Sequence, residues 1–233
     1  RFPTPYLCFE AVAHKYNIYA GDALDHAAMR ARAYAYCKVD PSRAPQTLLV
    51  ESRSHDPWQR TVARRVVNLD QVRRDLNRVA QAHNLTVRVA TFSDYDYCGQ
   101  VHLVAAAKVL VGVHGQGLSN TIFQRAGTLT VELFHPWFGA RPDGHNTLAV
   151  HAGKGYAAAP IAMSTCSTGT TYQDMLRWKF DKRCGTIIDT AALVRLLEDP
   201  VLVARTLGPS PIAVPDGVGE DGQDGFTPVG DGR

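Results

Sequence analysis

The chain has 233 residues, of which 45% are hydrophobic and 20% charged, values typical of a globular protein. This composition excludes a wholly disordered chain, a collagen and a coiled coil, and the longest apolar runs are too short to span a bilayer. Residues 208–233 contain five acidic residues and one Arg, so the rest of the chain carries 24 basic and 17 acidic residues. That excess suits an anionic partner such as a nucleotide, although an unspecialised basic surface explains it about as well.

The first 45 residues give a weak structural signal. Residues 22–36 are rich in alanine and favour a helix. The stretch 40–45, which contains two prolines, separates that helix from the segments that follow. Because the chain starts at Arg1 rather than Met, we expect it to be a fragment or a processed product, and an anchor or signal can lie upstream.

From residue 46 the pattern becomes regular. Apolar runs of strand length lie at 47–51, 85–90, 109–113 and 128–134, and they alternate with segments of helical periodicity at 69–80 and 101–107. Continuously apolar strands that alternate with helices predict a Rossmann-like, doubly wound parallel sheet covered on both faces.

Helix-capping residues mark two of the helix starts. Asn68 and Gln71 have the spacing of a capping box before the helix that follows residue 68. Asp189 is expected to cap a closing helix near the end of the ordered region.

Five cysteines lie at positions 8, 37, 98, 166 and 184. No two of them have the C-x-x-C spacing, so we expect no structural zinc site. The odd count precludes complete internal pairing, but Cys166 and Cys184 could close one loop in an oxidising compartment. Asn84-Leu85-Thr86 is the single N-x-[ST] sequon and makes Asn84 a candidate glycosylation site.

The most informative segment is an apolar strand that runs directly into residues 114–120, which read H-G-Q-G-L-S-N. Glycines let the backbone approach a ligand closely, and the N–H groups at a helix start carry partial positive charge. Open α/β sheets bind ligands at the carboxyl ends of their strands, so the pattern predicts a diphosphate site, with a tight turn that binds nothing as the alternative. The position after the third strand disfavours a dehydrogenase, and the lack of a P-loop lysine disfavours NTP hydrolysis.

Four further features are candidates for the same site. Arg53 and Arg64 could bind phosphate oxygens in a bidentate way, or could belong to a solvated basic loop. Glu132 lies among apolar neighbours and needs either a hydrogen-bonding ligand or an ion-pair partner. His114 is either a ligand contact or a turn residue, and Asp94-Tyr95-Asp96 reads more readily as the acidic start of a helix than as a metal site. The chain lacks the interleaved aromatic and basic residues that are typical of nucleic-acid binding, so we expect no nucleic-acid partner.

These segments together resemble the glycosyltransferase family 61 domain over about residues 46–135. The family shows a strand followed by H-G-A-G-L-[ST]-N, which corresponds to residues 114–120. It then shows a Pro/Ala-Gly turn, which corresponds to residues 126–127, and a strand with the pattern Val/Ile-[IV]-E, which resembles the V-E-L of residues 131–133. Upstream, its I-x-R, R-[RK]-x-x-N and E-Q motifs resemble Ser52-Arg53, residues 64–68 and residues 99–100. The chain departs from the family at Gln116, where the family carries Ala, and at Gly99, where it carries Glu.

The resemblance implies an inverting, two-lobed hexosyl- or pentosyltransferase of the GT-B type. Such an enzyme moves a sugar from a nucleotide-sugar donor, first of all a UDP-linked one, to a protein or polysaccharide hydroxyl, with no cofactor and weak or absent metal dependence. Carried over, Arg53 and Arg64 contact the donor diphosphate or base, and Glu132 lies near the nucleoside. The pyrophosphate is framed by the loop residues His114, Gly115, Gly117, Leu118 and Ser119.

The resemblance also implies a domain organisation and a compartment. Residues 1–45 are expected to be a remnant of the N-terminal acceptor lobe with a linker, 46–207 the Rossmann-like donor lobe, and 208–233 a disordered tail. The catalytic base is expected upstream of Arg1, and the compartment is the lumen of the Golgi or the endoplasmic reticulum. The alternative function is a catalytically incomplete nucleotide-binding module, either a degenerate transferase or a fragment.

Overall fold

The computed structural model describes residues 23–52, 64–138, 154–166, 169–181 and 184–199. Its centre is a five-stranded parallel sheet with the strand order β2-β1-β3-β4-β5. A short antiparallel pair, β6 and β7, lies beside it. The strands are β1 (Thr47–Glu51), β2 (Thr86–Ala90), β3 (Ala107–Val113), β4 (Leu129–Leu133), β5 (Gly155–Ala159), β6 (Ala162–Ser164) and β7 (Thr186–Ile188).

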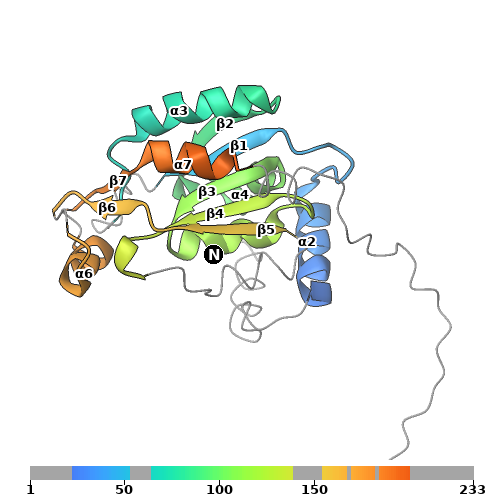
Figure 1. The fold of residues 1–233 in the computed structure, drawn as a ribbon. Coiled ribbons are helices and arrows are strands. Elements are labelled where there is room, and N and C mark those ends of the chain that lie inside the picture. Colours follow the sequence, from blue (N-terminus) through green and yellow to red (C-terminus); the bar gives the residue numbers. More distant parts are fainter. Residues whose placement is uncertain (1–22, 53–63, 139–153, 167–168, 182–183, 200–233) are drawn as a thin grey trace, which may run out of the picture.

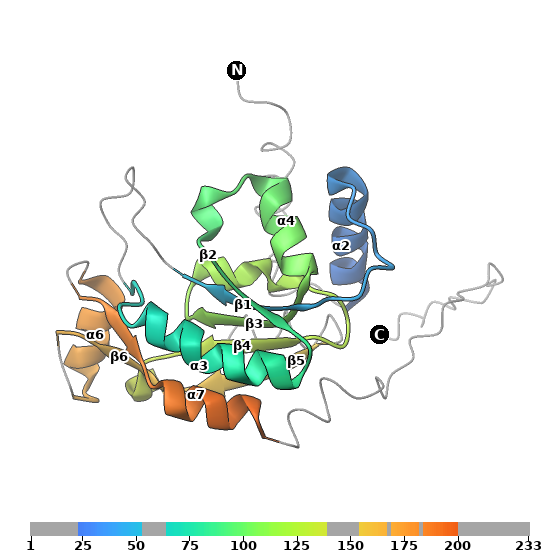
Figure 2. The same ribbon diagram turned by 90° about the horizontal axis from the view of Figure 1, so that it is seen from above.

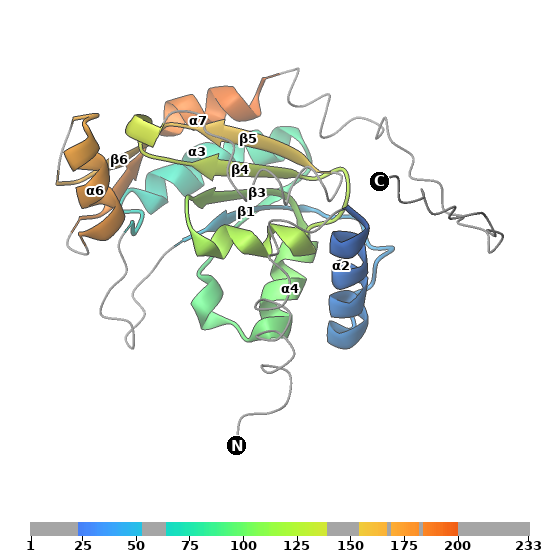
Figure 3. The same cartoon turned by 90° about the horizontal axis from the view of Figure 1, so that it is seen from below.

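Helices cover both faces of the large sheet (Figures 1 and 2). The helices α3 (Leu69–Ala82) and α7 (Thr190–Leu197) pack on one face. The helix α2 (Ala23–Cys37), the helix α4 (Tyr97–Ala105) and the 3-10 helix η2 (Gln116–Phe123) pack on the other face, which Figure 3 shows from below. The doubly wound α/β sheet predicted from the sequence is therefore confirmed.

Alternation along the strands divides the apolar core into two layers. In β1, Leu48 and Val50 belong to the core under α3 and α7, whereas Leu49 belongs to the core under α4 and η2. Successive strand residues point to opposite faces, so a strand covered on both faces must be apolar throughout. Glu51 continues the alternation and therefore points to the η2 face at the carboxyl end of β1.

The direction of the chain connections changes between β1 and β3. The chain leaves β1 toward α3 and returns as β2, whereas it leaves β3 through η2 on the opposite face and returns as β4. Adjacent strands whose connections depart to opposite faces leave an opening at their carboxyl ends, which is where open α/β sheets bind ligands. The predicted glycine loop follows β3 directly and lies at this opening.

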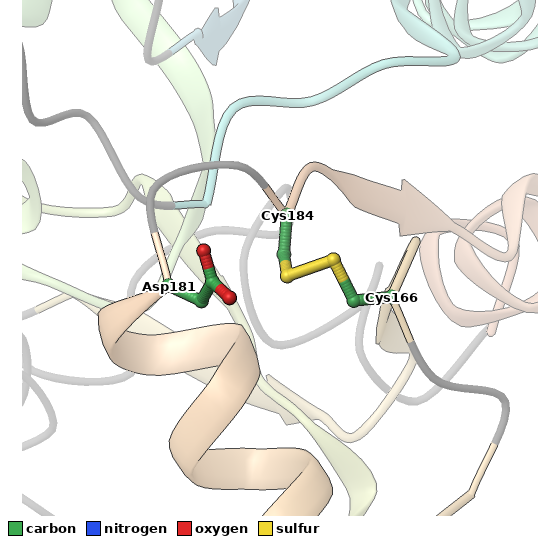
Figure 4. A group of neighbouring side chains, drawn as sticks. All are labelled: Cys166, Asp181 and Cys184. Carbon is green, nitrogen blue, oxygen red and sulfur yellow. A yellow bond between two sulfur atoms is a disulfide. The ribbon is translucent and has the colours of Figure 1, made fainter.

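The described residues contain two disulfides, one beside the β6–β7 pair and one between two helices. Cys166 and Cys184 are bonded, as the sequence suggested, and a second bond joins Cys37 of α2 to Cys98 of α4. Asp181 lies close enough to Cys166 and Cys184 for the three to hold a metal ion. Figure 4 shows that the two sulfurs are bonded to each other, so neither is a thiolate that could bind one.

The structure corrects two local predictions. The capping box at Asn68 and Gln71 is wrong, because the Asn68 side chain makes no cap and instead exchanges two hydrogen bonds with the backbone of Ile188, at 2.8 and 3.0 Å. The helix expected at 101–107 begins earlier, at Tyr97, where the Asp96 side chain accepts a bond from the Gly99 N–H. Asp96 therefore serves as a helix cap.

Four other predictions compare with the structure as follows. Asp189 caps α7 as expected, and the alanine-rich segment forms α2. The expected tail 208–233 lies outside the described residues, and the assignment of 1–45 to a second lobe stays a prediction. Among the described helices, none has both the length and the hydropathy that crossing a bilayer requires.

Replacement of Asn68 by Ala is expected to destabilise the protein by about 1 to 3 kcal/mol, because the buried N–H and C=O of Ile188 lose their partners. Urea unfolding followed by circular dichroism measures the change. Asn77→Ala is the matched control, since Asn77 is exposed on α3 and alanine favours a helix. Equal stability of the two variants would contradict this role of Asn68.

Candidate functional site

Three neighbouring strands bring polar groups to the same edge of the sheet. Glu51 in β1, Gly112 in β3 and Glu132 in β4 are register partners, so they lie in one row across the sheet. Both carboxylates are buried, although each belongs to a strand whose other residues are apolar except for one Thr. A glycine between them leaves the space above the central strand open to neighbouring side chains.

A short hydrogen bond joins His114 to Glu132 of this row. The Nδ1 atom of His114 lies 2.6 Å from the Oε1 atom of Glu132, and the Tyr156 hydroxyl donates to Oε2 at 2.5 Å. Because a carboxylate only accepts, Nδ1 of His114 carries the hydrogen. The carboxylate therefore fixes the orientation of the ring, and the His114 side chain remains 20% exposed. The buried Glu132 has the partner that its burial required.

The glycine loop is packed against the other carboxylate of the row. An added Cβ at Gly117 would lie 2.7 Å from the carboxyl carbon of Glu51, and one at Gly112 would lie 3.0 Å from its Oε2. Gly115 has a φ of 149°, which side chains rarely adopt. The sequence analysis interpreted the glycines as room for a ligand, and the structure shows that at Gly117 the room is taken by Glu51.

The loop continues into η2, whose first turn is firmly held. The N–H of Leu118 donates to the Gly115 carbonyl at 3.0 Å, and the Leu118 side chain is completely buried in the core under the sheet. Ser119 is half-buried. Of the predicted pyrophosphate residues, Leu118 therefore serves the core with its side chain, and only its backbone lies in the loop.

Arg64 is the predicted arginine that the structure places at the site. Its Nη1 atom donates to the His114 carbonyl, and its guanidinium lies 5.6 Å from the centre of the Trp178 ring. The backbone of Arg64 has a φ of 73°, in the left-handed region. The side chain thus bridges the segment before α3 and the end of β3, beside the glycine loop. Arg53, the second predicted arginine, lies outside the described residues.

Residues 10–131 match the model of the glycosyltransferase 61 family, which is more than half of the chain. The chain belongs to the glycosyltransferase 61 family. A comparison with curated proteins finds no match. The family match ends within β4, so it includes the glycine loop and η2 and stops one residue before Glu132.

Several motif residues of this family member have structural partners. Asn120 in η2 donates to the Gln100 side chain at 3.2 Å, and Gln100 in turn donates to the Tyr95 carbonyl at 3.1 Å. These bonds tie η2 to α4 on the lower face of the sheet. Together with Asn68, they show that the amide-bearing motif residues hold the loop and its supports in place.

Glu51 and Tyr156 are residues of the site that the sequence analysis missed. Tyr156 lies in β5, which gave no strand signal, and Glu51 is the more informative case. Locally it reads as the last residue of an apolar strand, and its importance depends on β3 being the neighbour of β1. The one available signal was a carboxylate at the carboxyl end of a strand that is expected to be buried.

Replacement of Gly117 by Ala is expected to cost about 1 to 3 kcal/mol of stability, because the new Cβ overlaps the Glu51 carboxylate. The loss should be partly recovered when Glu51→Ala is combined with it, and a double-mutant cycle of unfolding free energies measures that coupling. Gly127→Asn is the control, since nothing lies within 4 Å of an added Cβ there and Asn tolerates its left-handed backbone. Strictly additive losses would show that the two residues do not interact.

Proposed function

We propose that this family member transfers a sugar from a nucleotide-sugar donor, first of all a UDP-linked one, to a protein or polysaccharide hydroxyl with inversion at the anomeric carbon. The observation that carries the proposal is the His114–Glu132 pair, which lies beside the glycine loop at the carboxyl ends of β3 and β4, next to the point between β1 and β3 where the chain connections diverge. The family supports transferase chemistry, and this opening is the position at which such a sheet binds a nucleotide.

The donor diphosphate is assigned to the loop of Gly115, Gly117 and Ser119, with its charge met by cations. The Arg64 guanidinium supplies positive charge beside the loop, and we assign a second positive charge to His114 in its protonated form. These cations are needed because the Glu51 carboxylate lies against the same loop. When it is ionised, it repels a bound anion. Arg53 is assigned the same role, and Glu132 is assigned to the nucleoside side of the donor.

The reaction is an in-line displacement at the anomeric carbon. A base removes the proton of the acceptor hydroxyl while the loop and the cations stabilise the departing nucleoside diphosphate. We assign the base to the first lobe of a two-lobed GT-B enzyme, with residues 46–207 as the donor lobe. Because protein cations balance the leaving group, we expect weak or absent dependence on a divalent metal.

A second candidate function is a nucleotide-binding module without turnover. It is favoured by Gln116, which stands where the family carries Ala and adds a side chain to the loop of the donor site. In that case the chain would bind the nucleotide without transferring the sugar.

The compartment is assigned to the lumen of the Golgi or the endoplasmic reticulum. Two disulfides join the described elements, and disulfides persist in oxidising compartments. Asn84 is exposed at the turn between α3 and β2, where an N-linked glycan would meet solvent. That turn precedes β2, so it lies at the amino edge of the parallel sheet, away from the candidate site.

Calorimetric titration with UDP, GDP and NAD tests the donor assignment. UDP or GDP is expected to bind with micromolar affinity, unchanged by EDTA, and NAD is expected not to bind. Arg64→Ala should weaken binding by about tenfold or more, because a charge-assisted contact contributes about 1.5 to 3 kcal/mol. Arg74→Ala is the control on the exposed side of α3. Equal affinity of the Arg64 variant, or loss of affinity on chelation, would contradict the assignment.

Secretory expression tests the Asn84 assignment. The protein is expected to carry one enzymatically removable N-glycan, detected as a mass shift that Asn84→Gln abolishes. Thr86→Ser keeps the sequon and should keep the glycan. An unchanged mass in the Asn84 variant would show that this site is not used.

A further inference from the structure

Two exposed aromatic side chains lie together just beyond the carboxyl end of β4. Trp137, in the short helix η3 (Pro136–Phe138), is 40% exposed, and Tyr172, the first residue of α6 (Tyr172–Phe180), is 49% exposed. Their ring centres are 4.8 Å apart and the ring planes meet at 53°. The residues matched to the family end before either of them.

Buried contacts fix the position of Trp137. Its backbone N–H donates to the Nδ1 atom of His135 at 3.3 Å, and the buried His135 ring packs 5.9 Å from the ring of Trp178. Burial lowers the pKa of His135, and the nearby Asp174 carboxylate opposes this shift only in part. The His135 ring is therefore neutral at neutral pH, which leaves Nδ1 able to accept the bond.

A capping box fixes the position of Tyr172. The Thr171 side chain accepts a bond from the Asp174 N–H, and the Asp174 side chain accepts one from the Thr171 N–H, so α6 starts at a defined residue. Both rings are thus presented on a rigid support. A preorganised surface loses little conformational freedom when a ligand binds to it.

The aromatic pair is connected to the candidate donor site. Trp178 packs against His135 on the side of the pair, and its ring also contacts the guanidinium of Arg64, which bonds the His114 carbonyl. All three views show α6 beyond the arrowheads of β3 and β4, at the edge that carries the glycine loop (Figures 1, 2 and 3). The pair and the site therefore share one edge of the sheet.

We propose that Trp137 and Tyr172 bind a sugar ring of a carbohydrate acceptor by stacking. The face of an aromatic ring is negative, so it attracts the weakly positive C–H groups on the face of a sugar. The exposed Gln173 side chain follows Tyr172 directly in the sequence and can bond the sugar hydroxyls. This inference rests on the proposed function, because the acceptor is a substrate of the proposed sugar transfer. It narrows the class of acceptor from a protein or a polysaccharide to a carbohydrate.

The exposure of the pair identifies the acceptor as the source of that sugar. A donor sugar sits at the reacting centre, where water must be kept from the activated bond. Rings that are nearly half exposed do not exclude water, but they suit a chain of sugars that extends across the surface. The pair therefore serves acceptor units outside the reacting centre.

Calorimetric titration of the 233-residue chain with xylohexaose and with chitohexaose tests the proposal. A separate titration with UDP is made on each protein. At least one oligosaccharide is expected to bind, and Trp137→Ala and Tyr172→Ala are each expected to weaken that binding by about tenfold or more. Tyr172→Phe keeps the ring and should keep the affinity. Tyr36→Ala removes an aromatic ring that is 57% exposed on α2 and should change nothing. UDP affinity should be the same in all four variants.

Failure of both oligosaccharides to bind a protein that binds UDP would overturn the proposal, and so would binding that survives both alanine substitutions. Oligosaccharide binding that depends on Trp137 in a protein that does not bind UDP would uphold this inference while it overturned the donor assignment. The two proposals therefore fail by different observations.

Discussion

The order of the strands is the constraint on which the rest of the site depends. Because β1 and β3 are neighbours and their connections leave to opposite faces, the carboxyl ends of these two strands form the position at which open α/β sheets bind ligands. Glu51 and the glycine loop meet there, in a contact that permits no side chain at Gly117. A different strand order would bury the same residues in unrelated surroundings, and no site would form.

Charge at this edge is arranged in opposing pairs. Glu132 is held by His114 and Tyr156 on the side of β4. Glu51 underlies the loop from the side of β1, so a bound anion must be stabilised against it. Arg64 supplies further positive charge near the His114 backbone. In this account the glycine loop provides shape, and the side chains around it decide whether a diphosphate binds.

Local pattern was sufficient for much of the fold and for part of the site. A clear apolar pattern, or clear turn and capping residues, marked the strands β1 to β4, the helices α3 and α7 and the glycine loop. The strand β5 reads G-Y-A-A-A and lacks β-branched residues, and β6 and β7 have three residues each, so none of them has a usable pattern. Asn68 matched a cap by spacing but bonds Ile188, a partner far along the chain, and Glu51 matters only through its neighbour β3.

The central claim is that the nucleotide binds at the opening between β1 and β3. Hydrogen–deuterium exchange with and without saturating UDP tests it most directly, since it reports which backbone amides a ligand protects. The account predicts slower exchange in the loop of residues 114–119 and in the segment of residues 64–67, with no change in β2 or α7. Protection confined to the amino ends of the strands, in a protein that calorimetry shows to bind UDP, would contradict it.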